Sequence, residues 1–448
     1  MSTVMPPSSA PCTLKIAVVG GPQYDRLYER LPFFEQETGH KVEIIFQGPH
    51  PALNDYLSKT FKDYDKGSQT AVPDLDLCST HIKYAPSQAH FLQELGSDQI
   101  SVEDQDTFLP SALEASKVHG RLLQLPRMVD TRVLFYRIDV FETLGLKAPE
   151  TWQDLAVAAS HIRKASILVP PDAGTGVTQE ILEGYVFPGK LSGLFGTFYE
   201  LAMMEMESGE ALFGEDDRPI FDEGVVIRVL EYLKGLVETS AVPEGIESFY
   251  FDEVSNLFAE GKCGMVADWP SYYGEMKRKL LSSSSSKTGP PKIGVMRYPC
   301  GRNSKRSAYS GMHSFAIPKS CRHPEAALML LKFLIRDDQQ WLEASSSGSF
   351  PTKKAVLQRL LDTTTPVQAK EVEGEAAWRQ LDAERLKCLC ATVESDMAMF
   401  PHLKVYPELE DGLFPMIQDA MMGRISVEEA AAQMRAEAER IVGVAGRE

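Results

Sequence analysis

"HGRLLQLPRMVDTRVLFYRIDVFETLGLKAPETWQDL", residues 119–155, is the stretch on which the fold assignment depends. In its centre a charged triplet, Asp130-Thr131-Arg132, leads into the apolar run Val133–Tyr136. An apolar run of this kind is typical of a buried strand, where an acid and a base at the start are unusual. The role of the triplet depends on the organisation of the remaining chain.

The length and composition of the chain limit the classes of protein to which it can belong. With 448 residues it is too long for one compact core, so we expect two domains or lobes. Its hydrophobic content of 43% and charged content of 24% are ordinary for a soluble globular protein. The formal net charge of −17 argues against nucleic acid or anionic membranes as partners, because both attract basic surfaces.

The cysteines indicate whether the chain binds a metal or cofactor, and the first residues indicate where in the cell it is located. The seven cysteines include one close pair, Cys388-Leu-Cys390, without a second pair or a nearby histidine. We therefore expect free thiols in a reducing compartment, no metal and no cofactor. The first residues lack the basic and apolar segments of a signal peptide, and no stretch has the ~20 apolar residues that span a bilayer. As written, the chain is expected to be cytoplasmic, or periplasmic or extracellular if an export signal is missing from it.

Strand-like and helix-like segments alternate near the start of the chain. Apolar runs at 14–21, 41–48 and 73–80 are separated by helical patterns at 24–40 and 52–67. This alternation predicts an α/β fold in which helices cover a parallel sheet, with ligands outside the carboxyl ends of the strands. The residues at those ends form the candidate binding rim: Gly20, Gly21, Pro22, Gln47, Gly48, Thr80 and His81.

The later part of the chain contains mainly helical patterns. Thr151 is the expected N-cap of a helix at 151–165. Further amphipathic helices are expected at 224–238, 324–345 and 426–446. Strands are expected at 292–299 and 311–318, after a serine-rich surface loop at 282–291.

Four segments, in the family's order, resemble the extracellular solute-binding proteins of family 1, the sugar-capturing subunits of bacterial ABC importers. The opening stretch is similar to the family's hinge region, in which a proline leads into Leu-x-Tyr-x-x-Asp, Gly-Leu and Pro-x-Thr-Trp. "FAEGKCGMVADWPSYYGEMK" (258–277) resembles a Gly-Lys-x-x-Met run that ends in tryptophan. "AIPKSCRHPEAALMLLKFLIRDDQQWL" (316–342) and "GSFPTKKAVL" (348–357) resemble the two segments that follow.

The resemblance implies an α/β, two-lobe, type II periplasmic-binding-protein-like fold with a ligand cleft between the lobes. Lobe one would comprise residues 13–127 and 309–347, and lobe two, mostly helical, residues 133–300 and 350–448. The hinge crossings would be residues 128–132 and 301–308.

On this mapping the charged triplet lies at the first crossing. Asp130 occupies the place, six residues before Tyr136, where the resembling sugar binders carry an acid that accepts hydrogen bonds from sugar hydroxyls. An ionised carboxylate is suited to this role because its charged hydrogen bonds are strong. Arg132 would also face the cleft. The alternative is an ion pair between Asp130 and Arg132 that only fixes the hinge.

Trp269 matches the family's cleft tryptophan, whose ring would pack on the apolar face of a sugar. The alternative is a tryptophan that only closes the core. Asp268 and Tyr272 are its candidate partners in the site, and His313 would either contact the ligand or cap the returning strand. From lobe one the candidate ligand contacts are Gly21, Tyr24, Thr80 and His81. No catalytic residue is predicted.

We therefore expect a solute-binding protein that captures a small polar ligand, a carbohydrate, by hinge closure for ABC-type import. Its partners would be that ligand and the membrane subunits of an ABC transporter, and the protein would act as a monomer. One alternative is a thiaminase-like or pyrimidine-synthase-like enzyme on the same fold, in which Cys78 and His81 would supply a nucleophile and a base. Another is a cytoplasmic binder or sensor without a transporter. A ligand screen separates them, because a sugar would stabilise the binder and a heterocycle the enzyme.

Overall fold

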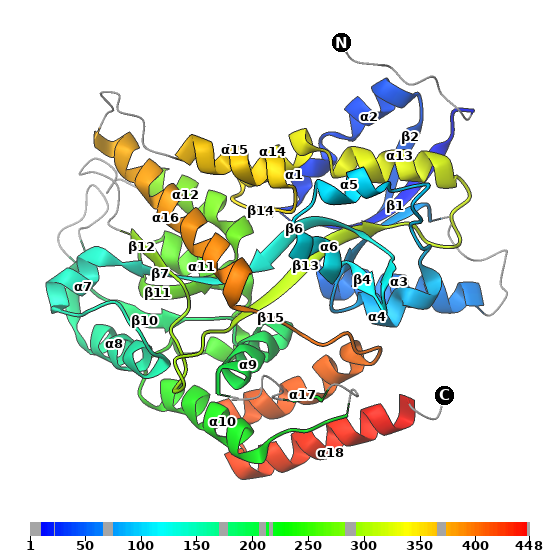
Figure 1. Cartoon of the computed structure of the whole chain (residues 1–448). Helices are drawn as coiled ribbons and strands as arrows, with labels where there is room; N and C mark the ends of the chain where they lie inside the picture. Colours follow the sequence, from blue (N-terminus) through cyan, green and yellow to red (C-terminus); the bar gives the residue numbers. More distant parts are fainter. Residues whose placement is uncertain are drawn as a thin grey trace. The chain divides into compact units, whose positions relative to one another are not determined.

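A computed structural model describes residues 10–21, 23–65, 75–169, 178–205, 212–214, 218–282, 293–364 and 373–445. Pro22 of the candidate rim and all but the first residue of the predicted loop at 282–291 lie outside the described residues. The chain divides into two compact units, whose elements are labelled in Figure 1. Unit 1 consists of the residues up to Asp130, Gly311–Leu360 and His402–Lys404. Unit 2 consists of Thr131–Ser310, Leu361–Pro401 and Val405–Glu448.

The sheet of unit 1 begins with the three predicted strands. Strand β1 (Thr13–Val19) pairs in parallel with both β2 (Lys41–Gly48) and β3 (Leu77–His81), as predicted. Strand β13 (Ala308–Ala316) is antiparallel to β3 and makes the sheet mixed. With β6 (Leu125–Thr131) and β14 (Phe350–Pro351), the strand order is β14-β6-β13-β3-β1-β2. The α/β class predicted from the alternating pattern is confirmed.

Helices and short strands complete unit 1. The helical pattern at 24–40 forms two helices, α1 (Asp25–Tyr28) and α2 (Leu31–Thr38), because Pro32 fits the first turn of a new helix. Gly39 ends α2 with a φ of 78°, a left-handed conformation that glycine adopts without strain. The other elements are α3 (His50–Asp65), α4 (Ala85–Gln88), η1 (Ala89–Phe91), α5 (Val102–Asp106), α6 (Pro110–Ala115), β4 (Lys117–Val118), β5 (Arg121–Leu122), α13 (Pro324–Leu334) and α14 (Asp337–Ser346). Helix α15 (Lys354–Thr364) begins in unit 1 and ends in unit 2.

Unit 2 has a separate four-stranded sheet. Its central strand β7 (Val133–Arg137) is antiparallel to β11 (Cys263–Asp268) and to β12 (Ile293–Met296). Strand β10 (Glu183–Val186) pairs in parallel with β11 at the edge. The other strands of the unit are the hairpin β8 (Ser166–Val169) and β9 (Thr178–Ile181), and β15 (Met397–Met399), which pairs with the first residues of β13.

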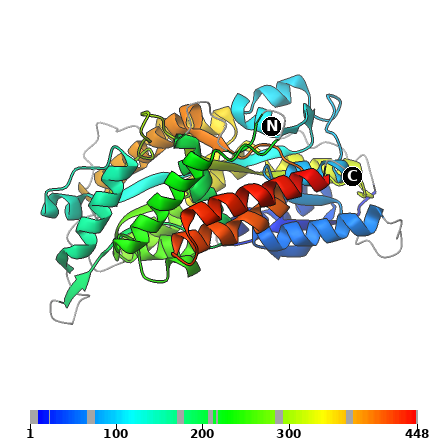
Figure 2. The same cartoon turned by 90° about the horizontal axis from the view of Figure 1, so that it is seen from below.

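Three helices of unit 2 correspond to those expected from the sequence at 151–165, 224–238 and 426–446. Helix α8 (Trp152–Lys164) begins with a capping box in which Thr151 and Asp154 exchange hydrogen bonds, so the predicted N-cap is confirmed. Helices α17 (Tyr406–Met421) and α18 (Val427–Ala445) lie side by side and contact α10 (Glu223–Glu238), as Figures 1 and 2 both show. The remaining helices are α7 (Ile138–Leu144), α9 (Leu191–Glu205), η2 (Ile246–Ser248), α11 (Phe251–Ala259), η3 (Pro270–Tyr272), α12 (Tyr273–Ser282) and α16 (Glu373–Ser395).

The chain first passes from unit 1 to unit 2 within β6, and it returns within β13. The first passage lies between Asp130 and Thr131, and the return lies between Ser310 and Gly311. The two charged residues of the triplet therefore belong to different units, Asp130 to unit 1 and Arg132 to unit 2.

Candidate functional site

His313 is the centre of a buried polar cluster in unit 1. Its Nε2 lies 2.5 Å from Asp130 Oδ2 and 3.0 Å from the hydroxyl oxygen of Tyr24. Its Nδ1 lies 2.7 Å from His50 Nε2. These four residues come from β13, β6, the turn before α1, and the start of α3, so the topology of the sheet brings together positions far apart in sequence. The predicted candidates Tyr24, Asp130 and His313 are in direct contact.

His81 completes the cluster at the end of β3. Its ring centroid lies 5.2 Å from those of both His50 and His313, and it meets the two rings nearly edge-on. The antiparallel register places His81 opposite His313. Gly311 makes room for the ring, because a Cβ at that position would lie 2.4 Å from His81 Nε2.

Asp130 is buried but only partly satisfied. Its Oδ2 contacts His313, whereas Oδ1 is buried without a hydrogen-bond partner among the described residues. An unpaired buried carboxylate oxygen is costly, so such an atom is a strong acceptor for a ligand donor. Arg132, the other charge of the triplet, pairs with Glu200 at 2.9 Å. Each of the two charges thus has a partner inside its own unit, which argues against the alternative of a structural Asp130–Arg132 pair.

A second buried ion pair supports the cluster. Arg127 Nε donates to both carboxylate oxygens of Glu343 at 3.0 and 3.1 Å. The same guanidinium donates to the backbone oxygen of Tyr24 and to the hydroxyl of Tyr28, each at 3.0 Å. Because one guanidinium holds both tyrosines, the turn that carries Tyr24 is fixed relative to β6.

Thr80 and Gly21, the other two candidates of unit 1, form hydrogen bonds with residues other than His313. Thr80 is buried, and its hydroxyl donates to Gln124 Oε1 at 2.5 Å. Gly21 has a φ of 140° and donates its backbone N–H to Asp25 Oδ1 at 3.0 Å. Gly21 therefore shapes the turn before Tyr24, while Thr80 takes part in a separate buried hydrogen bond.

The candidates of unit 2 surround a buried ion pair. Arg132 contacts Glu200 and also donates to Thr197 Oγ1 at 3.1 Å. Its guanidinium carbon lies 5.3 Å from the ring centroid of Trp269 and 5.9 Å from that of Tyr309, distances typical of cation–π contacts. Glu200 also accepts the backbone N–H of Tyr309 at 2.8 Å. The ion pair therefore packs against the rings of Trp269 and Tyr309. Trp269 remains partly exposed.

Asp268 anchors the backbone at Trp269. Its Oδ1 accepts the N–H of Trp269 at 2.8 Å, and its Oδ2 accepts the hydroxyl of Ser255 at 2.6 Å. Burial raises the pKa of Asp268 to about 7, although these two hydrogen bonds oppose the shift. Tyr272 follows in the next turn, where its backbone N–H donates to the oxygen of Trp269 at 3.2 Å. Asp268 and Tyr272 thus lie beside Trp269, as their sequence positions require.

We expect the Asp268→Asn variant to remove part of the pH dependence of stability. The pKa of Asp268 is higher in the folded protein than in the unfolded chain, so the wild type loses stability as pH rises from about 4 to 7. Asparagine mimics the protonated acid, because it accepts from Trp269 and donates to Ser255. Urea unfolding of both proteins should show the variant gaining roughly 2–3 kcal/mol relative to the wild type across this range. Parallel pH profiles would contradict the assignment.

Cys78, the candidate nucleophile of the enzyme alternative, is unsuited to that role. Its thiol is fully buried, contacts the backbone oxygen of Ala316, and has its pKa raised by burial to about 12. Within the part of the chain that the structure describes, no group of three or more His, Cys, Asp or Glu side chains is arranged to hold a metal ion. None of the described helices is both long and apolar enough to cross a membrane.

His50 and Glu200 make central contacts in these clusters, although neither was among the sequence candidates. His50 follows β2 in "QGPH" and so satisfies the same strand-end criterion that selected His81. Glu200 lies in the apolar helix α9, where no motif distinguishes it from a surface acid. The first could have been found from sequence, whereas the second depends on the packing of α9 beside Arg132.

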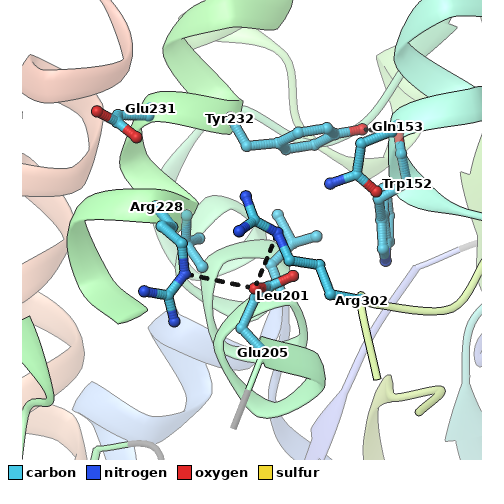
Figure 3. Close-up of a pocket in the computed structure, with 9 residues that line it drawn as sticks. Trp152, Gln153, Leu201, Glu205, Arg228, Glu231, Tyr232 and Arg302 are labelled. Atoms are coloured by element: carbon cyan, nitrogen blue, oxygen red, sulfur yellow. Dashed lines mark hydrogen bonds and ion pairs between the residues drawn. The ribbon is translucent and has the colours of Figure 1, made fainter. Parts of the chain in front are cut away.

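A separate cavity of about 240 Å³ lies in unit 2 among α8, α9 and α10 (Figure 3). Arg228 and Arg302 approach the same oxygen of Glu205 at 3.5 and 3.7 Å. Tyr232 closes one side by donating its hydroxyl to the backbone oxygen of Trp152 at 2.9 Å. None of the predicted site residues lines this cavity.

Comparisons with known proteins decide the family. The family model of bacterial extracellular solute-binding proteins matches residues 19–341, well over half of the chain. The chain belongs to the bacterial extracellular solute-binding proteins. A probable ABC transporter-binding protein of Deinococcus radiodurans is 25% identical over 337 residues, which is 74% of each chain. This confirms the resemblance predicted from the four segments.

Two further proteins that resemble this solute-binding protein have a ligand in their name or description. A mannitol-binding protein of Pseudomonas aeruginosa is 27% identical over 225 residues, 50% of this chain and 47% of that protein. The maltose-bound MalE3 of T. maritima has the same fold, with a TM-score of 0.77 at 22% identity over 96% of this chain and 99% of the other. The predicted two-lobe α/β fold of the solute-binding proteins is thereby confirmed.

Proposed function

We propose that this solute-binding protein captures a carbohydrate or a related polyol for import by an ABC transporter. The family description, the transporter named for the relative from Deinococcus radiodurans, and the mannitol and maltose named for the other two relatives support this function. In this proposal the protein works outside the cytoplasm as a monomer and presents its ligand to the membrane subunits. Ligand binding would shift a hinge equilibrium towards the closed form.

The observation that carries the proposal is the unpaired Oδ1 of Asp130. This buried carboxylate oxygen has no donor among the described residues, and a sugar hydroxyl would supply one. Tyr24 and His313 lie at hydrogen-bonding distance from one another beside the carboxylate, so they add polar groups for a second hydroxyl. A ligand with neighbouring hydroxyls suits this arrangement.

Unit 2 has its own candidate ligand contact at Trp269. Trp269 is partly exposed, and its ring lies 5.7 Å from that of Phe251 and 6.1 Å from that of Tyr309. Aromatic rings of this kind pack against the C–H face of a sugar. The buried Arg132–Glu200 pair holds the Trp269 ring in place, because the Arg132 guanidinium packs against it.

Tryptophan fluorescence tests this function. Titration with neutral sugars and polyols should change the emission of the wild-type protein in a saturable manner. The Trp269→Phe variant should lose most of the change and bind the ligand about tenfold more weakly, because the larger indole face is gone. The Trp341→Phe variant is the matched control in unit 1. A wild-type signal that persists in the Trp269→Phe variant would show that the ligand lies elsewhere.

A further inference from the structure

The cavity among α8, α9 and α10 brings two arginines to one carboxylate. The Nε atoms of Arg228 and Arg302 approach the same oxygen of Glu205, at 3.5 and 3.7 Å (Figure 3). Both distances exceed the about 2.7–3.2 Å of an N–H···O hydrogen bond. Glu205 therefore forms an ion pair with each guanidinium without satisfying the hydrogen-bonding capacity of either.

Arg228 has a donor that the described residues leave unsatisfied. Its Nε is buried and has no hydrogen-bond partner among them. A guanidinium carries several N–H donors, has no acceptor and stays charged at physiological pH. A buried donor without an acceptor is costly. An acceptor supplied by a ligand in the cavity would remove this cost.

The apolar part of the lining indicates the body of such a ligand. Trp152 and Tyr232 form an edge-to-face pair, with ring centroids 5.8 Å apart and ring planes at 79°. Leu201 and Val229 add aliphatic surface to the same cavity. Apolar walls with a few polar groups at one place are typical of small-molecule sites. Here the polar groups are cationic donors, so the lining suits an apolar body with an anionic head.

The acids of the lining limit the charge of that head. Glu205 faces both guanidiniums, whereas Glu231, the other acid, lies apart from them in Figure 3. A second negative charge on the ligand would be repelled by Glu205. A planar carboxylate also matches the fork of a guanidinium, with which it can form two parallel hydrogen bonds. These features favour a monocarboxylate over a phosphate dianion.

We propose that this cavity is a second ligand site, which takes a small monocarboxylate with an apolar body. Arg228 and Arg302 donate to the carboxylate, and the rings of Trp152 and Tyr232 pack against the body. The volume of about 240 Å³ lies below the about 300–1,000 Å³ of sites for drug-sized ligands, which suits a small molecule. The lining residues all belong to unit 2, and none is a candidate carbohydrate contact, so this site does not depend on the proposed function.

Calorimetric titrations of the full chain with benzoate and cyclohexanecarboxylate test the site. The wild type should bind at least one of them saturably, and it should bind benzyl alcohol, a neutral match for benzoate, at least about tenfold more weakly. The Arg228→Leu variant should weaken carboxylate binding by about tenfold or more. The Arg424→Leu variant, at an exposed arginine of unit 2 that pairs with Asp419, is the matched control and should bind like the wild type.

The Glu205→Gln variant should have the opposite effect. It removes the anion that competes for both guanidiniums, so benzoate should bind roughly tenfold more tightly. Arginines that only stabilise the fold would give no such gain. If Arg228→Leu does not fold, the wild type labelled with 15N at arginine Nε replaces it. The Nε–H signal of Arg228, assigned with the Arg228→Lys variant, should then shift on addition of benzoate.

Three results would overturn the proposal. The first is a wild type that binds neither carboxylate saturably. The second is an Arg228→Leu variant that binds them as tightly as the wild type, or an Arg228 Nε–H signal that does not respond to benzoate. The third is tighter binding of inorganic phosphate than of benzoate, which would exclude the monocarboxylate class.

Discussion

Replacing Asp130 with alanine is expected to weaken ligand binding about 100-fold, the largest effect on affinity among the residues of unit 1. The variant loses a charged acceptor and also leaves His313 Nε2 without its partner at 2.5 Å. Loss of a hydrogen bond to a charged group typically costs ~1.5–3 kcal/mol. Calorimetric titration of the sugar or polyol with the highest wild-type affinity measures this loss directly.

The more conservative Asp130→Asn variant separates charge from shape. Asparagine keeps an oxygen acceptor but removes the negative charge, so binding should weaken by about tenfold rather than 100-fold. Asp338, an exposed carboxylate of unit 1 that pairs with Arg336, provides the control variant Asp338→Ala. Unchanged affinity in Asp130→Ala, with a wild-type melting temperature, would show that Oδ1 is not a ligand acceptor.

The second large effect is expected on stability, from the buried pair of Arg132 and Glu200. Both side chains are almost completely inaccessible, with 1% and 0% exposure. Removal of one partner leaves an uncompensated buried charge, so Arg132→Met and Glu200→Leu should each lower the free energy of unfolding by ~3–5 kcal/mol. Denaturant unfolding of the two single variants and the double variant measures the coupling.

The double variant identifies the source of this effect. If the loss comes from the unpaired charge, then Arg132→Met combined with Glu200→Leu should be much less destabilised than the sum of the single changes. Arg278 and Glu275, an exposed pair in α12, form the control cycle, whose coupling should be below about 1 kcal/mol. Additive losses at Arg132 and Glu200 would contradict the structural role assigned to the pair.

Most of the fold could be predicted from the sequence because the local signals agree with one another. The apolar run at 14–21 and the periodic pattern at 224–238 form β1 and α10. Caps set the ends of α2 and α8 at Gly39 and Thr151. The break between α1 and α2 was missed, since the apolar spacing continues across it although Pro32 marks a new helix start.

The candidate site could be predicted only in part, because its contacts depend on strand register. Asp130 and His313 were both candidates, but their pairing results from the positions of β6 and β13 in one sheet. The contact of His50 with His313 joins residues 263 positions apart, a separation that no local pattern encodes. The sequence also left open a pair between Asp130 and Arg132, and the partner Glu200 had no signal of its own.

The measurement that tests the central claim most directly is a thermal-shift screen of the wild-type protein beside Asp130→Ala. The panel contains neutral sugars, polyols and thiamin-like heterocycles. A ligand that binds only the native state raises its stability. At least one sugar or polyol should therefore raise the melting temperature of the wild type by roughly several degrees. The same ligand should raise the melting temperature of Asp130→Ala much less, because its binding is expected to be about 100-fold weaker. A panel in which no sugar or polyol stabilises the wild type, or in which a heterocycle alone does so, would contradict the account.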